Sequence, residues 1–398
     1  MIQIAQLKNV IQDYAWGSRS SMSEVLGKDA PDQPEAEMWM GAHPSAPSMV
    51  RMPGGKQPLH TLIADDPDGW LGAPVAKEFG RLPFLFKLLA ADEPLSLQAH
   101  PTREQAIAGF ARENEAGIAL DARNRNYRDD NHKPEIICAV TEFWALRGFR
   151  QSEEIVDVLD HTESQALEPQ ASALRQQPGR DSLTALFAKM MELSDRDRET
   201  FVRSVVSYAK KKAETDSHWS WIERINSYYP DDIGVAGAAM LNIIRLDPGQ
   251  AMYLPAGELH AYLNGVGMEL MANSNNVLRG GLTPKHVDVP ELLNTLSFSM
   301  GPVDILSPKK SAGSEAVYQT PLKEFQLSVI HLLPYTPFKV GDHHIEILFC
   351  LKGSAVVSSK SMNDPLVMTR GESIVVPASA GPYTLSGEAT VYRATVPL

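Results

Sequence analysis

Residues 249–264 contain the side chain from which the chemistry of this chain is best approached. They read GQAMYLPAGELHAYLN, which is an apolar run, a Pro/Gly turn and a second apolar run with His260 just after the turn. This pattern predicts a β-hairpin that directs His260 into the interior of a barrel. Neutral imidazole is the commonest metal ligand in proteins, so the segment makes His260 a candidate ligand.

The spacing of these residues, G-x5-P-x-G-x2-H-x3-N, resembles the second motif of the cupin superfamily, whose double-stranded β-helix is related to jelly rolls. In cupins that histidine binds a metal together with ligands from an earlier pair of strands. The resemblance implies that the remaining ligands lie upstream of His260.

Two upstream segments supply suitable side chains. Residues 95–101 read LSLQAHP, and in a strand Gln98 and His100 would share one face because they are two residues apart. Residues 127–135 read YRDDNHKPE and end in Glu135. Gln98, His100, Glu135 and His260 make a set of nitrogen and oxygen donors without thiolate, which suits zinc, iron or manganese. Such a centre keeps a net positive charge and could stabilise an alkoxide of a polyol.

The same segments carry a closer resemblance. Residues 127–135 are similar to the first signature of type I mannose-6-phosphate isomerases, and residues 260–285 are similar to the second. The similarity continues at residues 14–17 (YAWG) and 37–41 (EMWMG), so it covers most of the chain. It implies a zinc-dependent aldose–ketose isomerase that holds one zinc ion per chain and interconverts mannose 6-phosphate and fructose 6-phosphate through a cis-enediol.

The family resemblance also assigns roles to residues. It implies that the zinc ligands are Gln98, His100, Glu135 and His260, and that Arg279 is the active-site arginine, which would stabilise the enediolate. Lys133 shares the face of Glu135 if this segment is extended, so we expect it near the metal as a proton carrier or in a structural role.

The chain as a whole is acidic, with a formal net charge of -12. To bind a sugar phosphate it must therefore concentrate positive charge locally at the site. We expect contacts to the substrate or its phosphate from three further side chains, which are those of Lys87, Ser96 and Lys285.

The chain departs from the family pattern at Asn275. Similar proteins usually read Ser-Asp-Asn where this chain reads Ser274-Asn275-Asn276, and some mechanisms give that aspartate a part in proton transfer. A sugar-phosphate-binding protein with little or no catalysis is therefore an alternative to the isomerase. An iron cupin dioxygenase is a further one, since two histidines and one glutamate form its usual triad. Gln98 argues against a dioxygenase, because its side chain would fill a coordination position on the metal that oxygen would need.

The expected fold is mainly β with an α-helical insertion: two cupin-like or jelly-roll β domains plus a helical domain. Apolar residues fall at helical spacing from about residue 151 to 238, and strand-like texture resumes after them. We expect a catalytic cupin domain formed by residues 1–150 and 239–300, a helical insertion of residues 151–238 and a C-terminal cupin-like domain of residues 301–398. Residues 371–377 echo the second cupin motif without its histidine, which predicts a metal-free domain with His343 and His344 at its surface.

The composition limits the kinds of partner that the protein can have and the cellular compartment in which we expect it. The acidic charge argues against nucleic acid and anionic membranes as partners, and no apolar run approaches the roughly 20 residues needed to span a bilayer. Cys138 and Cys350 lie apart in apolar runs, as expected of free thiols in the reducing cytoplasm. No signal peptide is visible, and we expect a cytoplasmic monomer.

Overall fold

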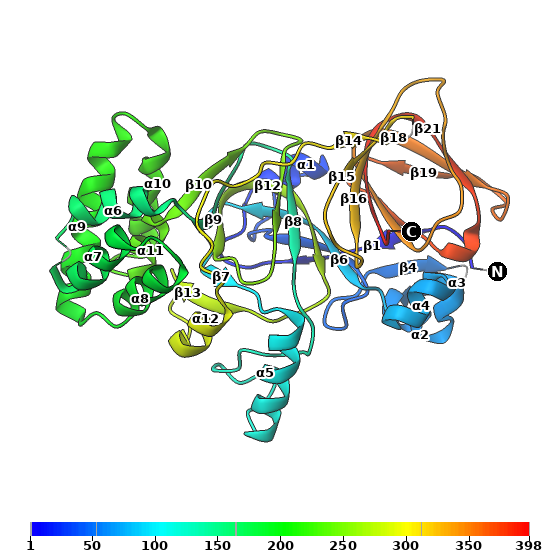
Figure 1. Ribbon diagram of the computed structural model, residues 1–398. Coiled ribbons are helices and arrows are strands. Elements are labelled where there is room, and N and C mark those ends of the chain that lie inside the picture. Colours follow the sequence, from blue (N-terminus) through cyan, green and yellow to red (C-terminus); the bar gives the residue numbers. More distant parts are fainter. Residues whose placement is uncertain (1, 53, 164, 312, 398) are drawn as a thin grey trace.

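The computed structural model describes residues 2–52, 54–163, 165–311 and 313–397. Two large sheets, each curled into a barrel, lie side by side, and a group of helices extends from the far side of the first barrel (Figure 1). The predicted fold class, two cupin-like β domains with a helical insertion, is confirmed.

The first barrel holds the residues singled out above. Among the described residues its sheet has ten antiparallel strands, which are β2 (Val10–Gln12), β3 (Glu37–Gly41), β6 (Phe84–Ala91), β7 (Leu97–Ala99), β8 (Glu135–Ala139), β9 (Phe143–Phe149), β10 (Leu241–Leu246), β11 (Ala251–Leu254), β12 (His260–Ala272) and β13 (Leu278–Gly281). The long strand β12 connects the two halves of the barrel, because its first part pairs with β7 and β9 and its second part with β6 and β8.

The predicted hairpin around His260 is wrong in its pairing. Strands β11 and β12 are not paired with each other; instead β8 lies between them, with Glu135 opposite Leu254 on one side and Met271 on the other. The turn crosses from one part of the barrel to another, and the Gly257 N–H donates to the carbonyl of His100 (2.8 Å). Long-range pairing of this kind is invisible to local alternation, although His260 still begins its strand facing the interior.

The helical insertion leaves and re-enters the barrel at one place. In the sequence, its helices lie between β9 and β10. These two strands pair antiparallel in the sheet, with Leu146 opposite Ile243, so the two ends of the insertion are close together. The insertion consists of α6 (Ser152–Asp160), η1 (Gln165–Leu167), α7 (Glu168–Gln176), α8 (Arg180–Met191), α9 (Asp195–Ala213), η2 (Ser217–Trp219), α10 (Ser220–Tyr228) and α11 (Ile233–Ala239). A hydrophobic core shared with Leu97 and Leu259 fixes this group on the barrel.

The second sheet draws on both ends of the chain. Residues 5–8, 49–52 and 55–58 pair within it, although the sequence places them in the first domain. Its strands are β1 (Ala5–Lys8), β4 (Met49–Met52), β5 (Gly55–Pro58), β14 (Lys309–Lys310), β15 (Glu315–Tyr318), β16 (Gln326–Leu332), β17 (Phe338–Val340), β18 (Glu346–Ser359), β19 (Leu366–Thr369), β20 (Ser373–Val376) and β21 (Tyr383–Thr395). One apolar core contains Phe86 and Met268 of the first barrel and Phe349 of the second, so the two barrels pack as one body.

The remaining helices cover the ends of the barrels. They are α1 (Ser21–Leu26), α2 (Leu59–Asp65), α3 (Pro67–Leu71), α4 (Ala73–Phe79), α5 (Arg103–Glu115), α12 (Val289–Thr295) and the short η3 (Ala378–Ala380). Helix α5 begins with a capping box, in which the Thr102 hydroxyl accepts from the N–H of Gln105 and the Gln105 side chain accepts from the N–H of Thr102. In the part of the chain described, no helix has the length and apolarity to cross a membrane.

Inside the second barrel, the buried carboxylates are already bonded to neighbouring side chains. Arg393 donates to Glu346 and to Glu315 (2.8 Å to the latter), and the Tyr383 hydroxyl donates to Glu346. The prediction of a surface position for His343 is wrong: the ring is buried and packs edge-on against Tyr383, with the centroids 5.3 Å apart.

Candidate metal centre

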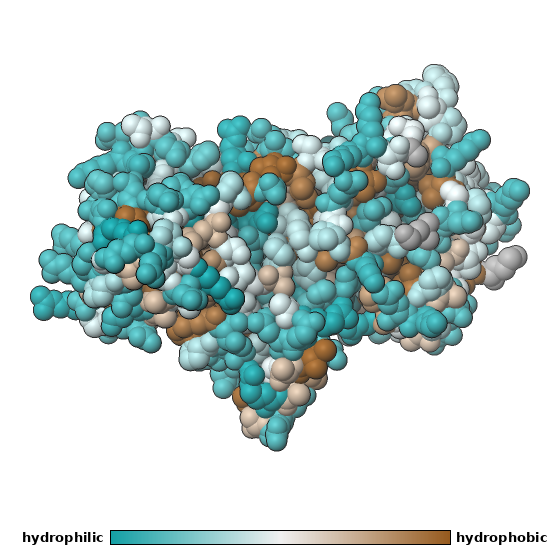
Figure 2. Space-filling view, viewed as in Figure 1, coloured by the Kyte–Doolittle hydropathy of each residue, from teal (hydrophilic) through white to brown (hydrophobic). Residues whose placement is uncertain are grey.

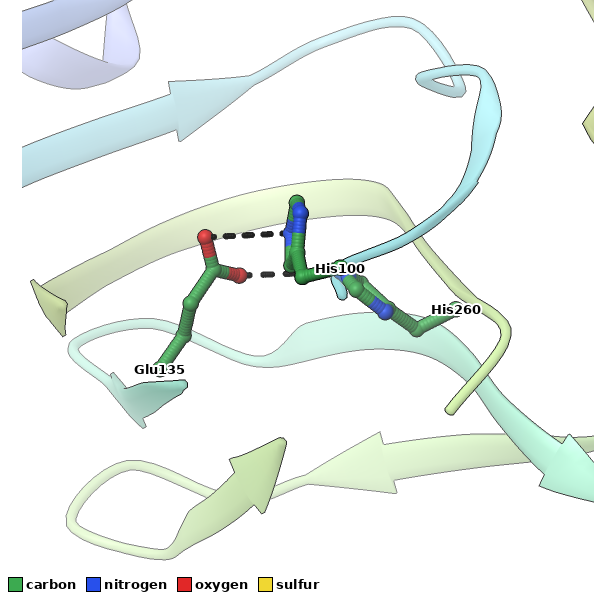
Figure 3. A group of neighbouring side chains, drawn as sticks. All are labelled: His100, Glu135 and His260. Carbon is green, nitrogen blue, oxygen red and sulfur yellow. Dashed lines mark ion pairs between the residues drawn. The ribbon is translucent and has the colours of Figure 1, made fainter. Parts of the chain in front are cut away.

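Three side chains from distant parts of the chain converge inside the first barrel. His100 directly follows β7, Glu135 begins β8 and His260 begins β12. One potential ligand atom from each lies within 4.8 Å of the others, and all three residues are at most 1% exposed. Figure 3 shows the glutamate facing the two imidazoles. The barrel closure therefore brings two nitrogen donors and one carboxylate together away from solvent.

Both imidazoles are held with one nitrogen free. The Nδ1–H of His100 donates to the carbonyl of Asn276 (2.8 Å), and that of His260 donates to the carbonyl of Glu258 (2.8 Å). A carbonyl can only accept, so this arrangement places the proton on Nδ1 and leaves a lone pair on Nε2. Both Nε2 atoms are buried and have no hydrogen-bond partner among the described residues; they lie 3.4 and 3.6 Å from Glu135 oxygens. Two buried, aligned and unsatisfied lone pairs fit a bound cation.

The electrostatic surroundings keep His100 and Glu135 in their metal-binding forms. Burial and then the ammonium group of Lys133 lower the pKa of His100 to about 4, so the ring is neutral near pH 7. Burial alone would raise the pKa of Glu135, but Lys133 and His100 outweigh it and hold that pKa well below its usual range. Neutral imidazoles and an ionised carboxylate are the forms that bind zinc.

Gln98 lies in the same row of the sheet as these ligands. It is directly opposite His260 across β7 and β12, and opposite Arg279 across β7 and β13. Directly paired residues point to the same face of a sheet, so Arg279, Gln98 and His260 project from one face on three neighbouring strands. A fourth, amide donor would complete the tetrahedral arrangement that zinc prefers.

Comparison with known proteins agrees with this geometry. Residues 4–152 match the catalytic domain of type I phosphomannose isomerases, residues 155–241 match their helical insertion domain, and residues 320–396 match the cupin domain of mannose-6-phosphate isomerases. A mannose-6-phosphate isomerase from Salmonella typhimurium is 39% identical over 394 residues, which are 98% of each chain. The chain belongs to the type I phosphomannose isomerase family.

More distant relatives and solved structures support the assignment. A human mannose-6-phosphate isomerase is 32% identical, covering 95% of this chain and 94% of its own. A crystal structure of the phosphomannose isomerase from Salmonella typhimurium superposes with a TM-score of 0.91 at 38% identity over the whole of both chains. A zinc-bound mannose 6-phosphate isomerase gives a TM-score of 0.90 at 38% identity, again over both whole chains.

Two lysines lie deep in the barrel beside carboxylates. Lys133 Nζ is 2.8 Å from Glu135 Oε1, so the expected placement of Lys133 on the face of Glu135 matches the structure. Lys87 Nζ is 2.8 Å from Glu269 and 3.5 Å from Glu37. Burial would lower the pKa of Lys87, but the carboxylates reverse this effect and raise it. The charge of Lys87 is thus compensated by carboxylates within the protein. A contact between Lys87 and the substrate stays a prediction.

The acidic partners of Lys87 in this network were not predicted from the sequence. Glu269 lies directly opposite Lys87 across β6 and β12, and its Oε1 accepts from the hydroxyl of Tyr262 (2.9 Å). The sequence did hold a signal for this pair, because a lysine and a glutamate each interrupt an otherwise apolar run. The other polar positions predicted to meet substrate, Ser96 and Lys285, lie just before β7 and after β13, and neither side chain is bonded within the described chain.

Asn275, where similar proteins usually carry aspartate, is exposed at the rim of the first barrel between β12 and β13. Its Oδ1 is 3.2 Å from Nε2 of His43, and its N–H donates to Asp129 (2.7 Å). Burial, the largest effect, lowers the pKa of His43. His132, three residues before Glu135, contacts Glu324 (2.6 Å) of the segment that leads into β16.

Proposed function

We propose that this protein is a zinc-dependent mannose-6-phosphate isomerase that interconverts mannose 6-phosphate and fructose 6-phosphate. The observation that carries the proposal is the pair of buried Nε2 lone pairs of His100 and His260 facing Glu135. Gln98 would be the fourth ligand. When bound, zinc would act as a Lewis acid that stabilises negative charge on the sugar oxygens.

The protein's own groups would carry the proton transfer between C1 and C2 of the open-chain sugar. Lys133, ion-paired with Glu135, would hold the proton that moves between these carbons, and Arg279, which lies in the ligand row, would stabilise the oxygen charge of the cis-enediolate through its guanidinium.

The test is a coupled assay of the zinc-loaded protein with mannose 6-phosphate. We expect steady formation of fructose 6-phosphate, and no turnover in a preparation holding about one zinc per chain would contradict the proposal. Sugar-phosphate binding without isomerisation would favour a binding protein in which Asn275 has removed a needed acid. Oxygen uptake with ferrous iron would indicate a dioxygenase.

All candidate ligands come from a single chain, which supports a working monomer. Both cysteines, Cys138 and Cys350, are buried and unpaired, as expected in a reducing cytoplasm. Elution volume on a calibrated size-exclusion column at several protein concentrations tests the monomer.

A further inference from the structure

Three cationic side chains on the segments around the metal centre have no counter-ion among the described residues. In the part of the chain that the structure describes, the side chains of Arg128, Arg279 and Lys285 form no ion pair or hydrogen bond. Lys87 and Lys133, in contrast, each have a carboxylate at 2.8 Å. Unneutralised positive charge is unexpected in a chain with a formal net charge of -12.

The three groups are close enough to repel one another. Burial, and after it the charge of Arg128, lower the pKa of Arg279. Burial, Arg279 and Arg128 together lower the pKa of Lys285. Because like charges at short range disfavour each other, an anion placed among them would remove this repulsion.

The main chain fixes Arg128 next to the metal centre. Its N–H donates to Oδ1 of Asn276 (2.7 Å), and the carbonyl of Asn276 is the group that holds Nδ1 of His100. The neighbouring acid forms no ion pair with Arg128 among the described residues; Asp129 is instead turned toward the β12–β13 segment, where it accepts from the hydroxyl of Ser274 through one oxygen (2.7 Å) and from the N–H of Asn275 through the other. The guanidinium is therefore left free on a firmly held backbone.

The distance of this cluster from the metal suits a substrate that is charged at one end. Arg279 lies two strands from His260 in the same row, which is roughly 10 Å at the usual strand spacing. An extended six-carbon sugar with C1 and C2 at the metal would place its phosphate at or just beyond Arg279. A solvated surface arginine would account for the exposure of Arg128, but it would not account for its convergence with two other unpaired cations.

We propose that Arg128 binds the phosphate group of the substrate together with Lys285, while Arg279 lies between the phosphate and the reacting carbons. Arg128 then contributes to the preference for phosphorylated over free sugars. This inference rests on the proposed isomerase function, and it adds a binding residue that the two sequence signatures left without a role.

The experiment compares Arg128→Gln with Arg123→Gln, which removes the same charge from an exposed arginine upstream in the same connecting segment. For each zinc-loaded protein we would measure kcat and KM for mannose 6-phosphate, and the dissociation constant of inorganic phosphate by calorimetry. Loss of a charged hydrogen bond should raise KM and the phosphate dissociation constant of Arg128→Gln about ten- to a hundredfold with kcat little changed. Arg123→Gln should match the wild type, and Arg128→Lys should recover part of the loss.

Changes below about twofold in both KM and phosphate affinity would overturn the inference. A fall in kcat with unchanged KM would also overturn it, because it would assign Arg128 to the transition state. If the wild type fails to isomerise mannose 6-phosphate, the phosphate titration still decides: weaker binding by Arg128→Gln alone upholds the anion site although the proposed function fails.

Discussion

The imidazole of His100 and the main-chain carbonyl of Asn276 are joined by a 2.8 Å hydrogen bond from Nδ1. The side chain of Asn276 meanwhile bonds the loop before β8 at Arg128, Asp129 and Asn131. One asparagine thus connects the orientation of a metal ligand to the loop that carries Lys133 and Glu135.

This connection predicts that Asn276→Ala weakens zinc binding although Asn276 is not a ligand. Loss of the side-chain bonds lets its carbonyl shift and His100 lose its orientation. Groups that orient a ligand typically contribute about 10–100-fold in metal affinity. Zinc affinity measured by chelator competition checks this, with Asn273→Ala as the control, since that side chain makes one long 3.4 Å bond to Leu82. Equal affinities of the two variants would contradict the predicted role.

The ligands themselves should differ in importance. Gln98→Ala deletes a neutral donor and should weaken zinc less than Glu135→Ala, which removes the only charged ligand. His260→Ala should abolish activity and leave the barrel folded, because the remainder of β12 is held by apolar packing. Zinc content by elemental analysis and far-UV circular dichroism separate metal loss from unfolding. Full metal and activity in His260→Ala would show that the ligand set is wrong.

Asn275→Asp tests whether a carboxylate at the rim is the missing base. We expect a change in kcat well below the ~100-fold lower limit usual for a general base, because Lys133 and Arg279 remain in place. A carboxylate 3.2 Å from His43 should raise the pKa of that histidine, since negative charge favours the imidazolium, and this should shift the pH–rate profile. A gain in kcat beyond about a hundredfold would instead identify the aspartate as the base and this chain as an impaired enzyme.

Glu324 should contribute to the attachment of the segment before β16 to the first barrel. Burial opposes ionisation, but His132 and Arg103 outweigh it and lower the pKa of Glu324 from 4.5 to about 2. Because the folded-state pKa is depressed, the stabilisation is present above pH 4.5 and disappears as the pH falls toward 2.

Glu324→Gln should therefore lower the free energy of unfolding by roughly 1–3 kcal/mol at pH 7, and by less near pH 3.5. Urea denaturation at both pH values measures the difference, and Glu388→Gln, which has no ion pair in the described chain, is the control. A loss that grows on acidification would have the opposite sign and would contradict the assignment.

Much of the site could be predicted from the sequence because its signals are local. The alternation of Gln98 and His100, and the signatures around Glu135 and His260, need only strand geometry and spacing. The pairing of β11 with β8, the crossing of β1 to the second barrel and the role of Asn276 could not be predicted. These depend on which distant strands become neighbours when the barrels close, and no local pattern encodes that choice.

The most direct test of the account is a zinc titration of metal-stripped protein, with isomerisation of mannose 6-phosphate as the readout. We expect no activity without metal, a linear rise with added zinc and a plateau at about one zinc per chain, with His260→Ala inactive throughout. Full activity of the stripped protein, or a fully loaded protein that leaves mannose 6-phosphate unchanged, would contradict it.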